Sequence, residues 1–371
     1  MSEMISTVDI ERSETTVPRP KPLRIAQVAP LYEAVPPKLY GGTERVVSYL
    51  TEELVRRGNQ VTLFASGDST TSAKLRPGYP ESLRLAGLTQ VAMNGMGLHF
   101  PMLSEVFDNA DDFDVIHAHL DYWAFSFARL VTTPTLTTLH GRLDIEELHP
   151  VYKHYEDLPL ISISDAQRIH LPSMNWVSTI HHGVPREHLH FNPKGGKYLA
   201  FLGRIAPEKR PDIAIQVARK AGIPLKIAAK VDVVDREYFE TVIEPMIKEG
   251  PGVEYIGEIN ELQKSEFLGN ALGLLFTIDW PEPFGLVMIE AMACGTPVIA
   301  RPCGSVPEVV RHGVTGFLAS EFDDLVAAVK KAETLSREAC RREFETRFAV
   351  DVMAEKYERI YRELIMIWNQ R

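Results

Sequence analysis

The sequence feature that most constrains the fold is a regular alternation of short apolar runs with helical patterns. An apolar run at Leu23 to Ala29 is followed by a helical pattern from Thr43 to Arg57 and by a second apolar run at Val61 to Ala65. Short apolar runs of this kind are typical of buried parallel strands, and repeated strand–helix–strand units build doubly wound sheets. The alternation restarts at Tyr198 to Leu202, after a stretch at Pro185 to Lys197 that has few apolar residues and is typical of a linker. We therefore expect an α/β protein with two doubly wound, Rossmann-like domains.

The expected domains are residues 23–190 and 191–348, preceded by a disordered tail over residues 1–22 and followed by a helix within residues 349–371. The tail mixes Ser, Thr, Glu and Pro without periodicity, which is typical of disorder. Ligands of doubly wound sheets bind beyond the carboxyl ends of the strands, so two facing sheets predict a site in the cleft between the domains. The remaining predicted strands are 115–118, 135–139, 160–163, 176–180, 225–229, 253–257, 273–277 and 297–300, and the remaining predicted helices are 122–131, 165–170, 211–221, 235–249, 260–270, 286–294 and 351–368.

The composition disfavours several classes of function. A formal net charge of −10 argues against nucleic acid as a principal partner, because phosphate backbones attract basic surfaces. The sequence has no run of about eighteen apolar residues, and its N-terminus is acidic where a secretory signal has basic residues, so we expect a cytoplasmic protein. Three cysteines are too few and too scattered for a disulfide framework or a zinc site.

The stretch from Glu282 to Gly295, EPFGLVMIEAMACG, predicts a buried helix that begins at a turn. Pro281 and Pro283 disfavour helical geometry before the turn, and Gly295 favours the end of the helix. The first N–H groups of such a helix and its dipole form an anion site. Glu290 lies on an otherwise apolar helix and needs hydrogen-bond donors, which ribose or sugar hydroxyls supply. In an alternative interpretation, Glu290 caps a neighbouring loop and Glu282 is a solvated turn residue.

Two cations follow the strand that opens the second domain. Arg204 and Lys209 lie in the sequence GRIAPEKRP, directly after the run at Tyr198 to Leu202. At the end of a strand, a guanidinium and an ammonium can both reach a pyrophosphate. Each cation alone is compatible with a solvated loop. Together with the helix N–H groups at Phe284 to Leu286, they predict a site for a diphosphate.

The pattern E-x7-E with F-G after the first Glu, combined with G-R-x4-K after a strand, resembles the retaining glycosyltransferases of the GT-B fold, family 4. The resemblance extends from about Leu23 to the C-terminus. It implies two facing Rossmann-like domains, an interdomain cleft, and a C-terminal helix that crosses back onto the first domain. By the same resemblance, Glu282 holds the donor sugar, the amides of Phe284, Gly285 and Leu286 hold the distal phosphate with Arg204 and Lys209, Glu290 holds the ribose, and the loop at Ile259 binds the base.

The first domain supplies further candidates. Gly41 and Gly42 follow the first strand, where the family's glycine loop lets the backbone approach the donor. His140 ends the strand 135–139, and the resemblance places a histidine there against the transferred sugar. His119 is a weaker candidate for the cleft, because a histidine at a strand end is more often structural. Ser164 and Arg168 are also weaker candidates, and the resemblance implies that the basic residue reaches the cleft.

The activity that the resemblance implies is transfer of a hexosyl group from a nucleotide sugar to an acceptor hydroxyl, by a front-face reaction in which Glu282 orients the sugar. We expect a UDP-sugar such as UDP-glucose as the donor, and neither a metal nor another cofactor. Asp112-Phe113-Asp114 has the letters of a D-x-D metal motif, but it leads into a strand instead of leaving one. The acceptor and the oligomeric state leave no signature, and a soluble acceptor is favoured over a membrane lipid.

Two alternatives remain open: a GDP-mannose-dependent mannosyltransferase, and a GT-B protein that binds or epimerises a nucleotide sugar. A dehydrogenase is disfavoured because no G-x-G-x-x-G follows the first strand. The sequence also departs from the family pattern in three places, namely Arg210 after Lys209, the stretch HHGVP at His181 to Pro185, and the stretch CGSVPE at Cys303 to Glu308.

Overall fold

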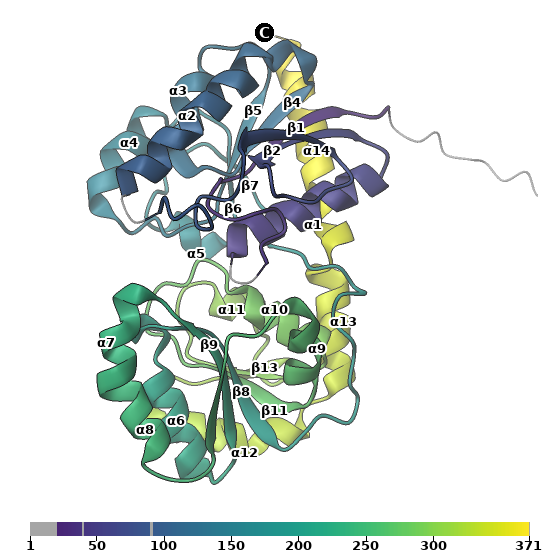
Figure 1. Ribbon diagram of the computed structural model, residues 1–371. Coiled ribbons are helices and arrows are strands. Elements are labelled where there is room, and N and C mark those ends of the chain that lie inside the picture. The colour runs from purple at the N-terminus through teal and green to yellow at the C-terminus, as the bar shows by residue number, and fades with distance from the viewer. Residues whose placement is uncertain (1–20, 39–40, 90–91, 371) are drawn as a thin grey trace, which may run out of the picture.

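The computed structural model describes residues 21–38, 41–89 and 92–370 and consists of two lobes, each built on a parallel sheet (Figure 1). The strand order is β3-β2-β1-β4-β5-β6-β7 in the first sheet and β10-β9-β8-β11-β12-β13 in the second. The order reverses between β1 and β4 and again between β8 and β11, which is the doubly wound pattern. The predicted α/β class and the two Rossmann-like domains are confirmed.

The elements of the two domains have the following bounds. The strands are β1 (Arg24–Val28), β2 (Gln60–Ser66), β3 (Lys74–Tyr79), β4 (Val115–Ala118), β5 (Thr135–Leu139), β6 (Leu160–Ser162), β7 (Trp176–Thr179), β8 (Tyr198–Ile205), β9 (Leu225–Val231), β10 (Val253–Gly257), β11 (Ala271–Phe276), β12 (Val298–Ala300) and β13 (Gly316–Leu318). The helices are α1 (Gly42–Arg56), α2 (Ala92–Asp108), α3 (Phe125–Ala128), α4 (His149–His154), α5 (Asp165–Arg168), α6 (Pro211–Ala221), α7 (Arg236–Tyr238), α8 (Glu244–Lys248), α9 (Glu261–Gly269), α10 (Leu286–Ala293), α11 (Val306–Val309), α12 (Phe322–Lys331), α13 (Arg337–Arg347) and α14 (Val350–Trp368).

Some predicted elements differ from the structure. The helix predicted over 122–131 is a 3-10 turn followed by the short α3. The helix predicted over 235–249 is interrupted by a π-helical turn at Phe239–Ile243, just before Pro245, whose nitrogen cannot donate a helical hydrogen bond. Strands β3 and β13 and helices α2, α12 and α13 were not predicted. Of the tail predicted over residues 1–22, residues 1–20 lie outside the described part of the chain.

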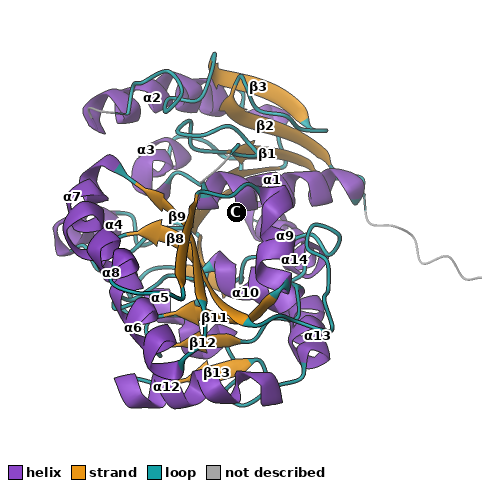
Figure 2. Ribbon diagram, turned by 60° about the horizontal axis from the view of Figure 1, so that its bottom comes forward, coloured by secondary structure: helices purple, strands orange, loops and turns teal. Residues whose placement is uncertain are grey.

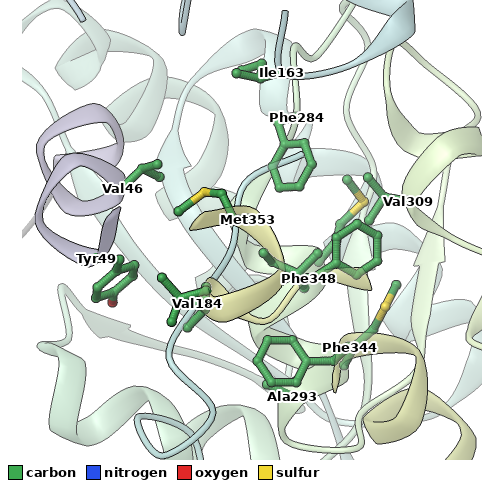
Figure 3. Close-up of a cluster of buried hydrophobic side chains, with 14 of the residues drawn as sticks. Val46, Tyr49, Ile163, Val184, Phe284, Ala293, Val309, Phe344, Phe348 and Met353 are labelled. Atoms are coloured by element: carbon green, nitrogen blue, oxygen red, sulfur yellow. The ribbon is translucent and has the colours of Figure 1, made fainter. Parts of the chain in front are cut away.

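Helices cover both faces of the second sheet. Successive strand residues point to opposite faces, so neighbouring residues of one strand belong to two different cores. Ile227 and Ala229 of β9 pack with α6 and α12, whereas Ala228 between them belongs to the core with α9, α10 and α13. Figure 2 shows α6 on one side of this sheet and α9 and α13 on the other. That second core continues into the first domain. Figure 3 shows Val46 of α1, Phe284 and Phe348 in one cluster of buried side chains. The turn that carries Phe284 is therefore anchored in a core to which both domains contribute.

The chain returns to the first domain at its C-terminal end. The Val184 N–H donates to the Phe348 carbonyl at 2.9 Å, and the Val350 N–H donates to the Val184 carbonyl at 3.0 Å, so the two crossings between the domains lie side by side. Helix α14 then packs against α1 and the first sheet (Figure 1). The Tyr357 hydroxyl lies 3.0 Å from the Thr138 hydroxyl of β5. The predicted crossing of the C-terminal helix is confirmed.

The described helices include no segment that is both long enough and apolar enough to span a lipid bilayer.

Helix α14 should contribute strongly to the stability of the first domain. Tyr357 is 1% exposed, so Tyr357→Ala removes a buried ring and is expected to lower the free energy of unfolding by about 3–5 kcal/mol. Met366→Ala on the same helix is the matched control. Met366 is 59% exposed, and its loss should cost less than about 0.5 kcal/mol. Urea unfolding measures both changes, and equal destabilisation would contradict the packing described for α14.

Candidate active site

A cavity of about 500 Å³ lies between the two domains. Its walls come from the loop after β1 and the start of α1 on one side, and from the carboxyl ends of β8, β9 and β10 with the turn before α10 on the other. This is where ligands of doubly wound sheets bind. The predicted site residues that line it are Gly41, Gly42, His140, Arg204, Lys209, Ile259, Glu282, Phe284, Gly285, Leu286 and Glu290.

The turn before α10 holds the start of that helix rigidly against the cavity. Gly285 has a φ of +80°, and a Cβ there would lie 2.9 Å from the Met288 methyl group and 3.0 Å from the Phe276 ring. The Ser305 hydroxyl donates to the Phe284 carbonyl at 2.8 Å, and Phe284 is only 2% exposed. The first N–H groups of α10 have no partner within the helix, so they are available to an anion in the cavity.

Lys209 and Glu282 form an ion pair at this end of the cavity. The Lys209 ammonium also lies 4.6 Å from the centre of the Trp280 ring, and the Trp280 indole N–H donates to Glu282 at 3.1 Å. The two predicted residues are thus in direct contact. Trp280, which sequence reasoning missed, orients both of them.

Arg204 lies on the same wall of the cavity as Lys209. Its guanidinium donates to Glu208 at 2.7 Å and to Asp235 at 3.2 Å, and its side chain is 26% exposed. The neighbouring Arg210 does not line the cavity, because its guanidinium binds Asp212. The departure from the family pattern at Arg210 therefore adds no cation to the site.

Glu290 ends a chain of charges that crosses the cleft. The Lys264 ammonium lies 2.7 Å from Glu290 and 2.6 Å from Glu261. Glu261 in turn accepts from the Tyr49 hydroxyl at 3.3 Å and pairs with Arg45 at 3.0 Å, both on α1 of the first domain. The donor that buried Glu290 requires is therefore a lysine 26 residues away, with no sequence signal near Glu290.

The glycine pair forms the N-terminus of α1. A Cβ at Gly41 would lie 2.7 Å from the Pro37 ring, so this position requires glycine. A Cβ at Gly42 would meet no atom within 4 Å, so close packing does not require glycine at this position.

His140 is held from behind by buried polar groups. Its Nε2 lies 2.8 Å from His119 Nδ1, and its ring stacks on His182 with the centroids 5.2 Å apart. Burial lowers the pKa of His140 to about 3 and the pKa of His119 well below its ordinary value, so both rings are neutral at physiological pH. His119 itself does not line the cavity. His182, which sequence reasoning missed, does.

Ser164 and Arg168 are not brought to the cavity. Ser164 is fully buried and caps α5, with its hydroxyl accepting from the Gln167 N–H at 3.1 Å. Arg168 donates to the Ser162 hydroxyl at 2.7 Å and lies over the Trp176 ring. Both residues make local structural contacts, and neither belongs to the lining of the cavity.

The first-domain wall contains groups that no motif indicated. Glu33 pairs with Arg84, and Tyr32 lies beside them. Glu44 is buried at the start of α1, and this burial raises the pKa of its carboxyl to about 7. These residues belong to the first-domain wall of the cavity, whereas Lys209 and Arg204 belong to the second-domain wall.

The D-x-D sequence lies away from the cavity. Asp114 pairs with Arg24 at 2.8 Å at the start of β4. Within the described ranges, no group of His, Cys, Asp and Glu side chains is arranged to hold a metal ion.

Two facing doubly wound domains, a C-terminal helix that returns to the first domain, and a charged cavity between the domains define the GT-B class of glycosyltransferases. Comparison with family models agrees. Residues 40–196 match the model "Glycosyltransferase Family 4" and residues 188–347 match "Glycosyl transferases group 1". The chain belongs to family 4 of the GT-B glycosyltransferases and is a glycosyltransferase enzyme.

The chain is also similar to individual proteins, one by sequence and two by fold. The D-inositol 3-phosphate glycosyltransferase of Mycolicibacterium smegmatis is 26% identical over 355 residues, which cover 80% of this chain and 79% of that protein. Sucrose-phosphate synthase of Thermosynechococcus elongatus superposes with a TM-score of 0.74 at 20% identity, over 93% of this chain and all of that one. HepE of Anabaena, in complex with UDP and glucose, superposes with a TM-score of 0.70 at 17% identity, over 92% of this chain and all of that one.

The turn before α10 can be tested through Gly285. Gly285→Ala places a Cβ at positive φ and against Met288 and Phe276, so the variant should lose more stability than the roughly 1–2 kcal/mol of backbone strain alone. Gly222→Ala is the matched control, because Gly222 also has a positive φ (+72°) but a Cβ there meets no atom. Thermal unfolding compares the two variants. Equal losses of stability in the two variants would contradict the close contacts described for a Cβ at Gly285.

Proposed function

We propose that the protein moves a hexosyl group from a UDP-sugar to an acceptor hydroxyl, with retention at the anomeric carbon, and that it acts in the cytoplasm. The observation that carries the proposal is the convergence of Arg204, Lys209 and the N-terminus of α10 on one end of the interdomain cavity. Two cations and a set of helix N–H groups match the charge and the several oxygens of a diphosphate.

The two cations and the helix N–H groups suit the charge that develops in the reaction. As the bond between the sugar and the diphosphate breaks, negative charge grows on the distal phosphate. Fixed donors at that phosphate lower the barrier without reorganisation. Because Lys209 is paired with Glu282, an entering phosphate competes for the ammonium and releases the carboxylate toward the sugar hydroxyls. This arrangement requires no further cofactor.

The transfer itself is a front-face exchange at the anomeric carbon. The bond from that carbon to the phosphate oxygen breaks, and a bond to the acceptor oxygen forms on the same face. The departing phosphate oxygen takes the proton of the acceptor hydroxyl, so the products are the glycoside and UDP. In this scheme Glu282 orients the sugar and does not attack it, which agrees with its engagement by Lys209 and Trp280.

The choice of UDP draws on a structural neighbour. The HepE complex contains UDP and glucose, and its fold matches this chain across both domains. The loop after β10 that includes Ile259 lines the cavity, and so does Glu290, which is compatible with a proposed role of the loop in binding the base and of Glu290 in binding the ribose. The mycobacterial relative is named for an inositol phosphate acceptor, which supports a polyol hydroxyl as the group that is glycosylated.

A panel of nucleotide sugars tests the proposal by thermal shift and by release of free nucleotide. A ligand present at about a hundred times its dissociation constant adds ~2.7 kcal/mol of stability. We expect UDP-glucose or another UDP-sugar to give the largest shift and to be hydrolysed slowly. A larger shift with GDP-mannose would overturn the choice of donor. Binding without any release of UDP would overturn the assignment as a transferase.

Lys209→Ala should lower kcat by roughly 10²-fold or more while changing donor affinity much less, because the ammonium acts on charge that grows in the transition state. Lys226→Ala is the matched control. Lys226 makes an ion pair with Glu254 on the same domain but lies outside the cavity, so its loss should leave kcat unchanged. Steady-state kinetics compare the two, and an unchanged kcat in Lys209→Ala would remove this residue from the mechanism.

Glu290→Gln should chiefly weaken binding of the donor. The neutral amide is a poorer acceptor for ribose hydroxyls than the carboxylate, and Lys264 loses one of its two carboxylate partners. Isothermal titration with UDP measures the effect, and Glu254→Gln serves as a charge-matched control away from the cavity. Equal dissociation constants for Glu290→Gln and the unmodified protein would contradict the ribose assignment.

A further inference from the structure

A continuous chain of hydrogen bonds runs through the core of the first domain and ends at His140. His140 Nε2 lies 2.8 Å from His119 Nδ1, and His119 Nε2 lies 2.7 Å from the side-chain oxygen of Gln27 on β1. The amide nitrogen of Gln27 lies 3.1 Å from the Tyr361 hydroxyl and 3.4 Å from His117 Nδ1. Nothing in the transfer chemistry described above requires Gln27, His119 or Tyr361.

The end of the hydrogen-bond chain that lies away from His140 also has a partner at each ring nitrogen of His117. The Tyr361 hydroxyl lies 2.7 Å from His117 Nδ1, and His117 Nε2 lies 2.7 Å from the Thr138 hydroxyl. Gln27, His117 and Tyr361 are all fully buried, so no bulk water can exchange with these partners. Each proton in the chain must therefore serve one of the contacts described.

One set of proton positions gives a donor and an acceptor to every contact in the chain except the long one of 3.4 Å between Gln27 and His117. The Gln27 NH₂ group donates to Tyr361, the Tyr361 hydroxyl donates to His117 Nδ1, and His117 Nε2–H donates to Thr138. At the other end the Gln27 oxygen accepts from His119 Nε2–H. His119 Nδ1 is then a lone pair and accepts from His140 Nε2–H. His140 therefore carries its ring proton on Nε2 and has a lone pair on Nδ1.

The reversed set of proton positions is less favourable. If the Gln27 amide is turned over, every bond in the chain changes direction and His140 carries its proton on Nδ1. That atom is buried and has no hydrogen-bond partner in the described part of the chain. A buried N–H without an acceptor is rarer in proteins than an unsatisfied acceptor, so the first arrangement is preferred. Among the three histidines of this hydrogen-bond chain, His140 is the one that lines the cavity, and its Nδ1 is the unsatisfied end.

We propose that Gln27 and His119 are positioning residues that fix the ring orientation and tautomer of His140, a residue that lines the cavity. The effect of this positioning on the reaction rests on the proposed function; the tautomer does not. The stacking of His182 on His140, with the two rings inclined by 19°, holds the ring plane from the other side. The buried polar chain thus fixes one orientation of a histidine ring in the cavity wall.

The C-terminal helix contributes a contact to Gln27 that His117 duplicates. Tyr361 belongs to α14 and lies 334 residues from Gln27 in the sequence. Its hydroxyl and His117 Nδ1 both face the Gln27 amide nitrogen, and together they keep the Gln27 oxygen turned toward His119. Because His117 remains when the Tyr361 hydroxyl is removed, Tyr361→Phe should preserve the tautomer.

The direct test is a ¹⁵N NMR spectrum of the protein labelled at its histidine ring nitrogens, because protonated and unprotonated ring nitrogens have well-separated shifts. The His140 signals are assigned by their absence in His140→Gln. We expect the His140 Nδ1 signal at the unprotonated position and the Nε2 signal at the protonated position. The opposite pattern would overturn the proposal, and the spectrum needs no substrate.

Kinetics provide the second readout. Gln27→Met keeps the length of the side chain but removes the acceptor of His119 Nε2–H, so a population of His140 protonated on Nδ1 should appear in the spectrum. The rate of UDP release from UDP-glucose should fall about tenfold or more, as expected for a lost hydrogen bond that leaves a buried group unsatisfied. Tyr361→Phe is the control for altered packing and should retain the rate within about twofold.

Each remaining outcome decides one question. A folded Gln27→Met protein with the tautomer and rate of Tyr361→Phe would overturn the positioning role. If Gln27→Met does not fold, the spectrum of the unmodified protein still tests the tautomer. The predicted tautomer in a protein that releases no UDP from UDP-glucose would uphold the assignment of the proton chain and refute the UDP-glucose activity, so the two failures are distinguishable.

Discussion

The structure depends on the way in which the turn before α10 is fixed between the two domains. Phe284 is inserted into a core to which both domains contribute, and the next residue, Gly285, adopts a backbone conformation that favours glycine. The helix that follows is apolar apart from Glu290 and is buried from Met288 to Ala293, so the position of the turn determines where the helix begins. Its N-terminus consequently faces the cavity. The strongest feature of the site, a fixed set of backbone donors, thus results directly from packing of the core.

Charge balance explains how the cavity keeps several ionised groups at low exposure. An unpaired buried charge costs several kcal/mol, and each major cation of the second-domain wall has a carboxylate partner. Lys209 pairs with Glu282, Arg204 with Glu208 and Asp235, and Lys264 with Glu290 and Glu261. A diphosphate enters such a site by exchange, since its oxygens replace carboxylates as the partners of the cations. The carboxylates that are released lie beside the hydroxyl-bearing parts of the ligand, so binding conserves the number of paired charges.

The fold was largely predictable from the sequence because the central strands are continuous apolar runs. Strand β3 escaped prediction because it is a half-buried edge strand that contains Pro77 and Gly78, both of which weaken a strand pattern. Helix α2 contains two glycines and Pro101, and it depends on burial of residues such as Leu103 instead of on helix propensity. In both cases tertiary contacts outweigh the local signal.

The same contrast between local and tertiary signals applies to the prediction of the site. The groups on the loops that begin helices were found because turn chemistry is local, and Arg204, Lys209, Glu282 and Glu290 all line one cavity. Groups that act across the fold were missed. Lys264 reaches Glu290 from another helix, and the polar chain behind His140 is completed by Tyr361 from the far end of the sequence. Ser164 was a weak candidate because a serine before a helix is as well suited to capping as to binding a ligand, and in the structure it caps α5.

The measurement that tests the central claim most directly is a crystal structure of the protein with UDP. The account predicts that the distal phosphate lies within hydrogen-bond distance of the backbone N–H groups of Gly285 and Leu286, with Lys209 and Arg204 turned from their carboxylate partners toward the diphosphate, and with the ribose at Glu290. A nucleotide bound outside the interdomain cavity, or a diphosphate that leaves the Lys209–Glu282 pair and the start of α10 untouched, would contradict it.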